Sequence, residues 1–421
     1  MNMHINDKKK KAILVDIVHP QTSKEESQDR LEELESLVNT YGGIVVVKSI
    51  QKRSMPNYDT YVGSGKLDEI EEIARENKAD ILIINNILKP RQLFNLEERF
   101  RPLNLQPWDR VELILKIFSK HAKTTEAQLQ IELASIKHMG PRIYKMGGEL
   151  MQQTGALGLR SGQGETNIEL MKRHLRKQEL AILDKLKHYD TIRAGHRKRR
   201  KRNDLKTIAL IGYTNAGKSS LLKALTQKDV YVADELFATL DTRVAKLYIP
   251  GSAKMEEGKY VAGEHFLLSD TIGFIQDLPP FLIEAFKSTL METIEADFLL
   301  HVIDINDPKI DRKISVVEDI LTQLGLEDKP RSYVFNKVDL IAHTNFFEDK
   351  DPHRPVEYTL VKAGKDAPIL LGWLDPMKNG LARKKIESLG EKYDKFSPVF
   401  VSAEKKMNLP ELIENLQSKT S

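Results

Sequence analysis

The sequence predicts an α/β protein of three successive parts: a small parallel α/β domain over residues 1–120, a long antiparallel helical hairpin over 121–205, and a larger α/β domain over 206–421. Three observations predict this organisation. Apolar runs of strand length alternate with helical patterns at both ends of the chain, two long apolar stripes of helical spacing lie between them, and a glycine-rich turn directly follows the apolar run 207–211. Alternation of strands and helices is typical of parallel sheets covered by helices.

Length and composition restrict the class of protein. The chain has 421 residues, 40% of them hydrophobic and 30% charged, with a formal net charge of +4. These values fit a globular protein of two or three domains. The absence of cysteine excludes disulfides, thiolate metal sites and a cysteine nucleophile. No apolar run reaches the ~18 residues of a membrane helix, so we expect no transmembrane segment and a cytoplasmic location, with membrane association left open.

The first part is expected to alternate strands with helices. The predicted strands are residues 12–18, 44–47 and 81–84, and the predicted helices are 23–40, 67–76 and 91–100. Fully apolar strands of this kind favour a parallel sheet. Gly63-Ser64-Gly65-Lys66 looks like a phosphate-binding sequence, but it is too short for a P-loop, and a plain loop before a helix is the favoured interpretation.

The second part is predicted to be a pair of long helices. Leu129, Leu133 and Ile136 recur at intervals of four and three, and a second stripe follows at Ile168, Met171, Leu175, Ile182, Leu186, Tyr189 and Ile192. One apolar stripe on each helix predicts an antiparallel hairpin. Thr125 and Gln128 fit a capping box at its start. The glycine-rich connection, roughly residues 140–165, is predicted to be a long loop, and such loops are usually functional or disordered.

The hairpin carries all of the basic excess. Residues 121–205 hold 18 Lys and Arg against 9 Asp and Glu, whereas residues 1–120 are neutral overall and 206–421 carry a net charge of −5. Such a segment is a candidate nucleic-acid surface, although a charge run also fits a solvated helix face. The residues expected to contact RNA are Arg197, Lys198, Arg199, Arg200, Lys201 and Arg202.

The third part opens with a phosphate-binding loop. Gly212-Tyr213-Thr214-Asn215-Ala216-Gly217-Lys218-Ser219 fits G-x4-G-K-S and stands between a predicted strand and a predicted helix, which is the context this motif needs. Its backbone N–H groups and the helix N-terminus attract phosphate oxygens. Lys218 is expected to reach the β- and γ-phosphates, and the Ser219 hydroxyl is expected to bind Mg²⁺.

Three further motifs follow in the order of a guanine-nucleotide-binding domain. Asp270-Thr271-Ile272-Gly273 ends a strand, so that Asp270 would hold Mg²⁺ through a water and the Gly273 N–H would meet the γ-phosphate. In Asn336-Lys337-Val338-Asp339, the Asp339 carboxylate can accept from guanine N1–H and the 2-amino group, a donor pair that adenine lacks. Ser402-Ala403-Glu404 can offer a backbone N–H to the guanine oxygen.

Together these motifs make the chain resemble the HflX family of GTPases, in the Obg–HflX group of ribosome-associated GTPases, over nearly its whole length. In the first two parts the resemblance rests on Tyr61-Val62-Gly63-Ser64-Gly65-Lys66, Leu93-Phe94-Asn95-Leu96-Glu97, Gln130-Ile131-Glu132-Leu133-Ala134 and Gly164-Glu165-Thr166. In the third it rests on the phosphate loop, Leu236-Phe237-Ala238-Thr239-Leu240-Asp241, Asp270-Thr271-Ile272-Gly273-Phe274 and Glu284-Ala285-Phe286-Lys287-Ser288-Thr289-Leu290.

The resemblance implies a Ras-like P-loop GTPase domain and a GTP hydrolase that binds the large ribosomal subunit and its rRNA, and that splits or rescues stalled ribosomes. It implies that the N-terminal half binds the ribosome and that the hairpin loop reaches toward the peptidyl transferase centre. Spacing leaves Thr239 and Thr242 open as the switch threonine, and the family match selects Thr239. The alternative is a GTP-regulated RNA-binding switch in ribosome assembly or RNA modification without splitting activity.

The expected ligands are GTP or GDP and Mg²⁺, and the expected oligomeric state is a monomer. Phe274 stands where many small GTPases carry the glutamine that positions water, so a low intrinsic rate is expected. Two roles remain open for Asn215: binding K⁺, as in related GTPases, and bracing the loop.

The residues expected to bind GTP are Gly212, Tyr213, Thr214, Asn215, Ala216, Gly217, Lys218, Ser219, Ser220, Phe237, Ala238, Thr239, Leu240, Asp241, Asp270, Thr271, Ile272, Gly273, Asn336, Lys337, Val338, Asp339, Ser402, Ala403 and Glu404. Of these, Lys218, Thr239 and Gly273 are assigned to catalysis, and Ser219, Thr239 and Asp270 to Mg²⁺.

The sequence also departs from the family pattern. The hairpin loop reads Ser161-Gly162-Gln163-Gly164-Glu165 instead of Arg-Gly-Pro-Gly-Glu, and Asp241-Thr242-Arg243 replaces the usual Asp-Pro-Thr. Because the guanine motif and the Ser402 loop are far apart for this fold, residues of about 341–379 are predicted to be an insertion. These departures concern the ribosome contacts rather than the nucleotide site.

Overall fold

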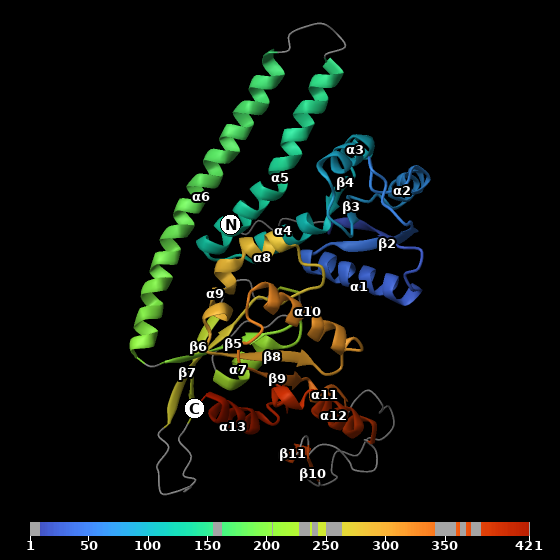
Figure 1. Ribbon diagram of the computed structural model, residues 1–421. Coiled ribbons are helices and arrows are strands. Elements are labelled where there is room, and N and C mark those ends of the chain that lie inside the picture. The colour runs from blue at the N-terminus through green and yellow to red at the C-terminus, as the bar shows by residue number, and fades with distance from the viewer. Residues whose placement is uncertain are drawn as a thin grey trace, which may run out of the picture. The chain divides into compact units, whose positions relative to one another are not determined.

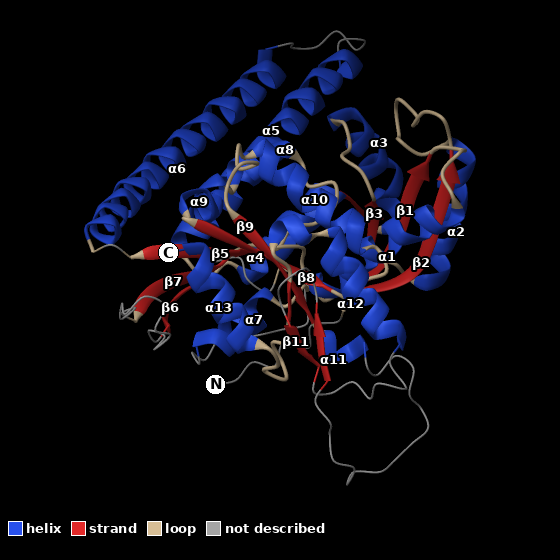
Figure 2. Ribbon diagram, turned by 60° about the horizontal axis from the view of Figure 1, so that its bottom comes forward, coloured by secondary structure: helices blue, strands red, loops and turns tan. Residues whose placement is uncertain are grey.

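A computed structural model describes residues 9–154, 162–203, 205–226, 236–237, 243–249, 263–341, 359–362, 368–371 and 380–420. The chain forms two compact units. The first comprises Met1–Thr191 with Pro279–Ala285, and the second comprises Ile192–Leu278 with Phe286–Ser421. The predicted fold class, an N-terminal parallel α/β sheet, long paired helices and a P-loop domain, is confirmed (Figures 1 and 2).

The first unit contains a four-stranded parallel sheet in the order β2-β1-β3-β4. Its strands are β1 (Lys11–Val18), β2 (Ile44–Lys52), β3 (Ile81–Ile84) and β4 (Gln106–Asp109), and its helices are α1 (Lys24–Tyr41), α2 (Ser64–Asn77), α3 (Pro90–Phe100) and α4 (Arg110–His121), with the short 3-10 turn η1 (Arg101–Leu103). Because successive side chains of a strand point to opposite faces, Ile13 and Val15 of β1 pack with the apolar residues of α2 and α3.

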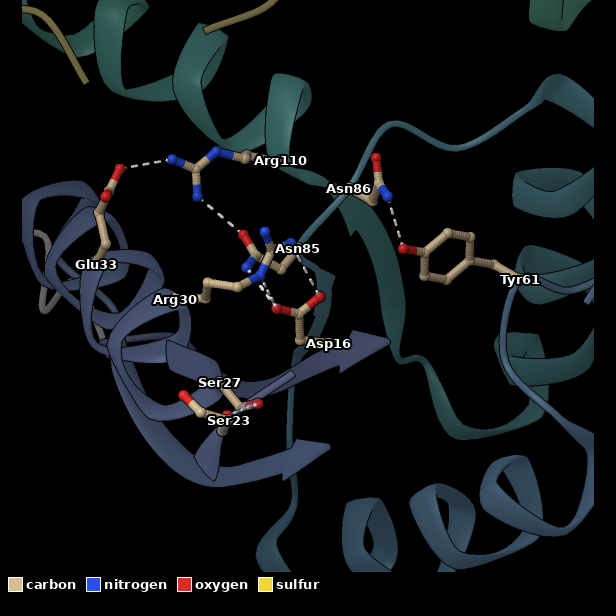
Figure 3. Close-up of polar contacts among 9 residues, drawn as sticks. All are labelled: Asp16, Ser23, Ser27, Arg30, Glu33, Tyr61, Asn85, Asn86 and Arg110. Carbon is tan, nitrogen blue, oxygen red and sulfur yellow. Dashed lines mark hydrogen bonds and ion pairs between the residues drawn. The ribbon is translucent and has the colours of Figure 1, made fainter. Parts of the chain in front are cut away.

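Asp16, on the other face of β1, is fully buried. Its carboxylate accepts hydrogen bonds from Arg30 Nε at 2.8 Å and from Asn85 Nδ2 at 2.9 Å. Arg110 donates to Asn85 Oδ1 at 2.8 Å and pairs with Glu33 at 2.6 Å (Figure 3). A buried carboxylate is tolerated when it is paired in this way, so this network ties α1 and α4 to the sheet.

The sequence did not predict β4 and α4. β4 has four residues and contains Pro107, which lacks the N–H that a central strand donates. Proline is tolerated there because β4 is the last strand in the order. Asp109 then caps α4 by accepting from the Glu112 N–H at 2.8 Å.

The predicted helical hairpin is confirmed, but its connection is much shorter than expected. In helices α5 (Thr125–Thr154) and α6 (Gly162–Arg202), Leu129 and Leu133 pack with Ile182. Most of the predicted 140–165 loop is therefore helical, because a glycine costs a helix only about 1 kcal/mol and does not forbid it; residues 155–161 lie outside the described residues. The Thr125 cap was also wrong, since Thr124 Oγ1 accepts from the Ala127 N–H at 3.2 Å.

The second unit contains a six-stranded sheet in the order β12-β9-β8-β5-β7-β6, in which all neighbouring strands are parallel except β6 and β7. Its strands are β5 (Lys206–Ile211), β6 (Arg243–Ile249), β7 (Glu264–Asp270), β8 (Phe298–Asp304), β9 (Arg331–Asn336) and β12 (Val399–Phe400). Its helices are α7 (Lys218–Thr226), α9 (Lys287–Glu295), α10 (Ile310–Gln323), α11 (Val338–Ile341), α12 (Gly380–Lys392) and α13 (Leu409–Thr420), with the 3-10 turn η3 (Asp394–Phe396). Apolar residues of α7 and α13 share one core cluster, and those of α10 and α12 share another.

Two further segments complete the fold. The short helix α8 (Pro280–Ala285) belongs to the first unit, where the Phe281 ring stacks on His138 of α5 with ring centres 5.8 Å apart. Within the predicted insertion the structure describes an antiparallel pair, β10 (Thr359–Lys362) and β11 (Pro368–Leu371). Among the helices that the structure describes, none is long and apolar enough to cross a membrane.

Candidate functional site

The phosphate loop follows β5 and contains two glycines, Gly212 and Gly217, that no other residue could replace without strain. Gly212 has a φ of +145°, and a Cβ there would lie 2.2 Å from the Val302 carbonyl oxygen. Gly217 has a φ of +90°, and its Cβ would lie 2.2 Å from Asn336 Nδ2. Only glycine adopts such backbone angles at low cost, so the sequence of the loop follows from its close contacts.

Lys218 begins α7 and turns its ammonium group back into the loop. The side chain is buried, and Nζ donates to the carbonyl oxygens of Gly212 at 3.1 Å and Tyr213 at 2.8 Å. Burial lowers the pKa of Lys218 to about 8, against the opposing effect of the Asp270 carboxylate. A desolvated cation in a loop of this shape is suited to bind phosphate oxygens.

Ser219 and Asp270 meet next to this lysine. β7 ends at Asp270, whose Oδ2 accepts a hydrogen bond of 2.6 Å from Ser219 Oγ. A hydroxyl and a carboxylate beside a phosphate site are the oxygen ligands that Mg²⁺ takes in proteins. The described residues thus fit this ion. Thr239, which was assigned to the same ion, lies outside the described residues, as do Ala238, Leu240 and Asp241.

The segment after Asp270 is bonded to the phosphate loop. The Thr214 N–H donates to the Phe274 carbonyl at 2.8 Å, and the Phe274 N–H donates to the Gly212 carbonyl at 3.1 Å. Tyr213 Oη accepts from the Gln276 N–H at 2.8 Å. A Cβ on Gly273 would lie 2.7 Å from the Thr214 side chain. Sequence reasoning missed these contacts because no motif contains Gln276 or predicts the role of the Tyr213 hydroxyl.

Asn336 joins the guanine motif to the rest of the site. Its Nδ2 donates to the Ala216 carbonyl at 3.0 Å, and its Oδ1 accepts from the Ala403 N–H at 2.9 Å. Lys337 pairs with Asp304 at 2.9 Å, and Asp339 lies in α11. The structure therefore brings the phosphate loop, Asp270–Gly273, Asn336–Asp339 and the Ser402 loop to one place, and this arrangement can hold a nucleotide between its phosphate and base ends.

The basic run at the end of α6 divides into two kinds of residue. Arg200 is mostly buried and pairs with Glu292 of α9 at 2.9 Å. Lys198, Arg199 and Arg202 are exposed. The side chains of Arg197 and Lys201 lie outside the described residues. The run therefore combines a residue that holds the second unit together with residues that face solvent.

Comparisons with known proteins agree with this site. Residues 28–119 match the family model described as GTP-binding GTPase N-terminal, residues 121–200 match GTP-binding GTPase Middle Region, and residues 207–337 match 50S ribosome-binding GTPase. The chain is 44% identical to the GTPase HflX of Caldanaerobacter subterraneus, over 79% of this chain and 73% of that protein. It is 37% identical to the GTPase HflX of Escherichia coli, over 80% and 75%.

A solved structure, the SsGBP–GDP complex, has the same fold. It superposes with a TM-score of 0.50 and 24% sequence identity, covering 98% of both chains.

Proposed function

The chain belongs to the HflX family of GTPases and hydrolyses GTP, and we propose that it couples GTP binding and hydrolysis to association with the large ribosomal subunit and to the splitting or rescue of stalled ribosomes. The observation that carries the ribosomal part is the match of the nucleotide-binding region to a family described as 50S ribosome-binding. The basic surface of α6 supports rRNA as the component of the subunit that the chain contacts.

The cations of α6 point largely to solvent. Those described as exposed are Lys172, Arg173, Arg176, Lys177, Lys185, Lys187, Lys198, Arg199 and Arg202. Exposed lysines and arginines along one helix are suited to phosphate backbones, whose neutralisation releases counterions and makes binding depend steeply on salt. The same helix would therefore bind rRNA mainly through phosphates.

In the proposed hydrolysis step, the phosphate loop and Lys218 hold the β- and γ-phosphates. Ser219 and Thr239 would hold Mg²⁺ directly, and Asp270 would hold it through a water. When bound, Mg²⁺ neutralises charge on the phosphate oxygens. The Gly273 N–H would contact the γ-phosphate.

A low intrinsic rate follows from the residue after Gly273. Phe274 is fully buried and has no polar side-chain atom to orient water, and even glutamine-bearing GTPases reach only ~10⁻⁴–10⁻³ per second without an activator. The large subunit would accelerate hydrolysis by fixing the segment around Thr239 and Gly273 in the position that the reaction needs. Asn215 has a φ of +61° in the phosphate loop and is proposed to bind K⁺, which would neutralise transition-state charge; bracing of the loop is the competing role.

The test is the GTPase rate with and without purified large subunits, in matched K⁺ and Na⁺ buffers. We expect a slow basal rate, acceleration by subunits, and faster hydrolysis in K⁺. Subunit splitting is then measured with GTP, GDP and a non-hydrolysable GTP analogue. A fast basal rate that subunits leave unchanged contradicts the coupling, and equal rates in the two salts contradict only the K⁺ role. Subunit binding without splitting would select the RNA-binding switch.

A further inference from the structure

Two neighbouring loops of the first unit form a surface that the nucleotide site does not use. Residues 53–63 connect β2 to α2, and residues 85–89 connect β3 to α3. Because these strands are parallel members of one sheet, both loops lie at its carboxyl edge. This is the edge at which open α/β sheets bind their ligands.

The longer loop is held in place by side chains of the shorter loop and α3. Asn86 Nδ2 donates to Tyr61 Oη at 2.8 Å (Figure 3). Gln92 Nε2 donates to the Asn57 carbonyl, and Asn95 Nδ2 donates to the Asp59 carbonyl, both at 2.8 Å. The loop is therefore ordered before any partner arrives, which lowers the entropy cost of binding.

This ordered loop nevertheless presents apolar side chains to solvent. Met55 is 77% exposed, Tyr58 is 65% exposed, and Ile87 of the neighbouring loop is 46% exposed. Two cations lie over the Tyr58 ring, with Lys89 Nζ 5.8 Å and Arg91 Cζ 5.4 Å from its centre. Asp59 pairs with Arg91 at 2.7 Å and so helps to fix it.

We propose that Tyr58, Lys89 and Arg91 form a binding site for an unstacked base of single-stranded RNA. The Tyr58 ring would stack on the base, and the two cations would contact the flanking phosphates. An aromatic platform beside cations is the usual recognition chemistry for single-stranded nucleic acid. The identification of the natural partner as rRNA rests on the proposed function, whereas the base-binding chemistry does not.

The test uses Tyr58→Ala, Tyr58→Trp and the matched control Tyr248→Ala, all in the full chain. Tyr248 is also exposed, at 57%, but it lies on β6, and its ring is beside His265. Two affinities are measured: for purified large subunits by sedimentation, and for a labelled oligouridylate of about 12 nucleotides by anisotropy. Melting curves verify that each variant is folded.

We expect Tyr58→Ala to weaken both affinities about five- to a hundredfold, the usual loss for one stacked base. Tyr58→Trp should retain binding, and Tyr248→Ala should leave both affinities unchanged. Unchanged affinity of Tyr58→Ala for both ligands overturns the proposal. A loss for subunits alone also overturns it, because the surface would then contact a ribosomal protein.

The two proposals can fail separately. If the unmodified protein binds oligouridylate through Tyr58 but does not bind large subunits, the proposed function fails and the base site stands. If Tyr58→Ala binds both oligouridylate and subunits normally while loss of the exposed α6 cations weakens subunit binding, the base site fails and the proposed function stands.

Discussion

The nucleotide site and the end of helix α6 both consist of polar residues that the sequence singles out, yet the structure treats them differently. In the nucleotide site, single side chains join segments far apart in the sequence: Asn336 bonds both Ala216 and Ala403, and Asp270 bonds Ser219. At the end of α6, Lys198 and Arg199 are exposed, whereas Arg200 is tied into the fold through Glu292.

The difference shows what kind of information each pattern carries. A ligand with fixed geometry requires defined atoms at defined distances, so its motif spacing predicts a three-dimensional arrangement. A phosphate backbone requires positive charge but tolerates many positions. Single substitutions should therefore have large effects in the nucleotide site and small effects on α6.

One glycine from each region gives the strongest contrast. Gly217→Ala places a Cβ against Asn336 at a φ of +90°, and strain and overpacking together cost about 2–5 kcal/mol, roughly 30- to several-thousand-fold in GTP affinity. Gly195→Ala in α6 meets open space and should stabilise the helix by about 0.5–1 kcal/mol. Competition of GTP against fluorescent GDP measures the loss of GTP affinity, and thermal unfolding measures the change in helix stability. Equal GTP affinity in both variants would contradict the strained-loop argument.

The next effect concerns base selection. Asp339→Asn removes the charged acceptor proposed for guanine, and a charged hydrogen-bond pair contributes about 1.5–3 kcal/mol, or ten- to a hundredfold in affinity. Competition of GTP and ATP against fluorescent GDP is the measurement, and Asp319→Asn, at an exposed position of α10, is the matched control. If the unmodified protein binds ATP as tightly as GTP, Asp339 does not select the base.

The sequence predicted much of the fold because the apolar runs of both sheets are long and bounded by turn residues. β4 was not predicted, because four residues that include Pro107 do not resemble a strand. The predicted hairpin loop was too long, because glycines such as Gly147 are typical of helix ends but here lie within α5. At the site, motif order predicted which segments meet. It could not predict the Tyr213–Gln276 hydrogen bond or the grouping of α8 with the first unit, because both depend on tertiary packing.

The pH dependence of binding also separates the regions. Burial lowers the pKa of Lys218 to about 8. Its phosphate-binding charge is present below that pH and is lost as the pH rises, so GTP affinity should fall about tenfold by about pH 9. Arginines stay charged throughout this range, so subunit binding through α6 should change little. Titrations at several pH values measure both, with Lys218→Arg as the control that should flatten the GTP profile. A flat profile in the unmodified protein would contradict the lowered pKa.

The smallest effect on subunit affinity is expected from substitutions of single arginines of α6. Two such arginines should differ in the property that changes: the salt dependence of binding for one, and the stability of the fold for the other. Arg199→Ala should reduce the log–log salt slope of subunit binding by about one phosphate contact, ~0.9, with only a modest loss of affinity. Arg200→Ala should leave that slope unchanged, because Arg200 already pairs with Glu292; instead it should lower the unfolding free energy by about 1–3 kcal/mol. Sedimentation at several salt concentrations, together with denaturant unfolding, distinguishes the two variants. If the two arginines change the slope equally, the Glu292 pair does not keep Arg200 from RNA, and the division of the basic run into a structural and an RNA-facing part is wrong.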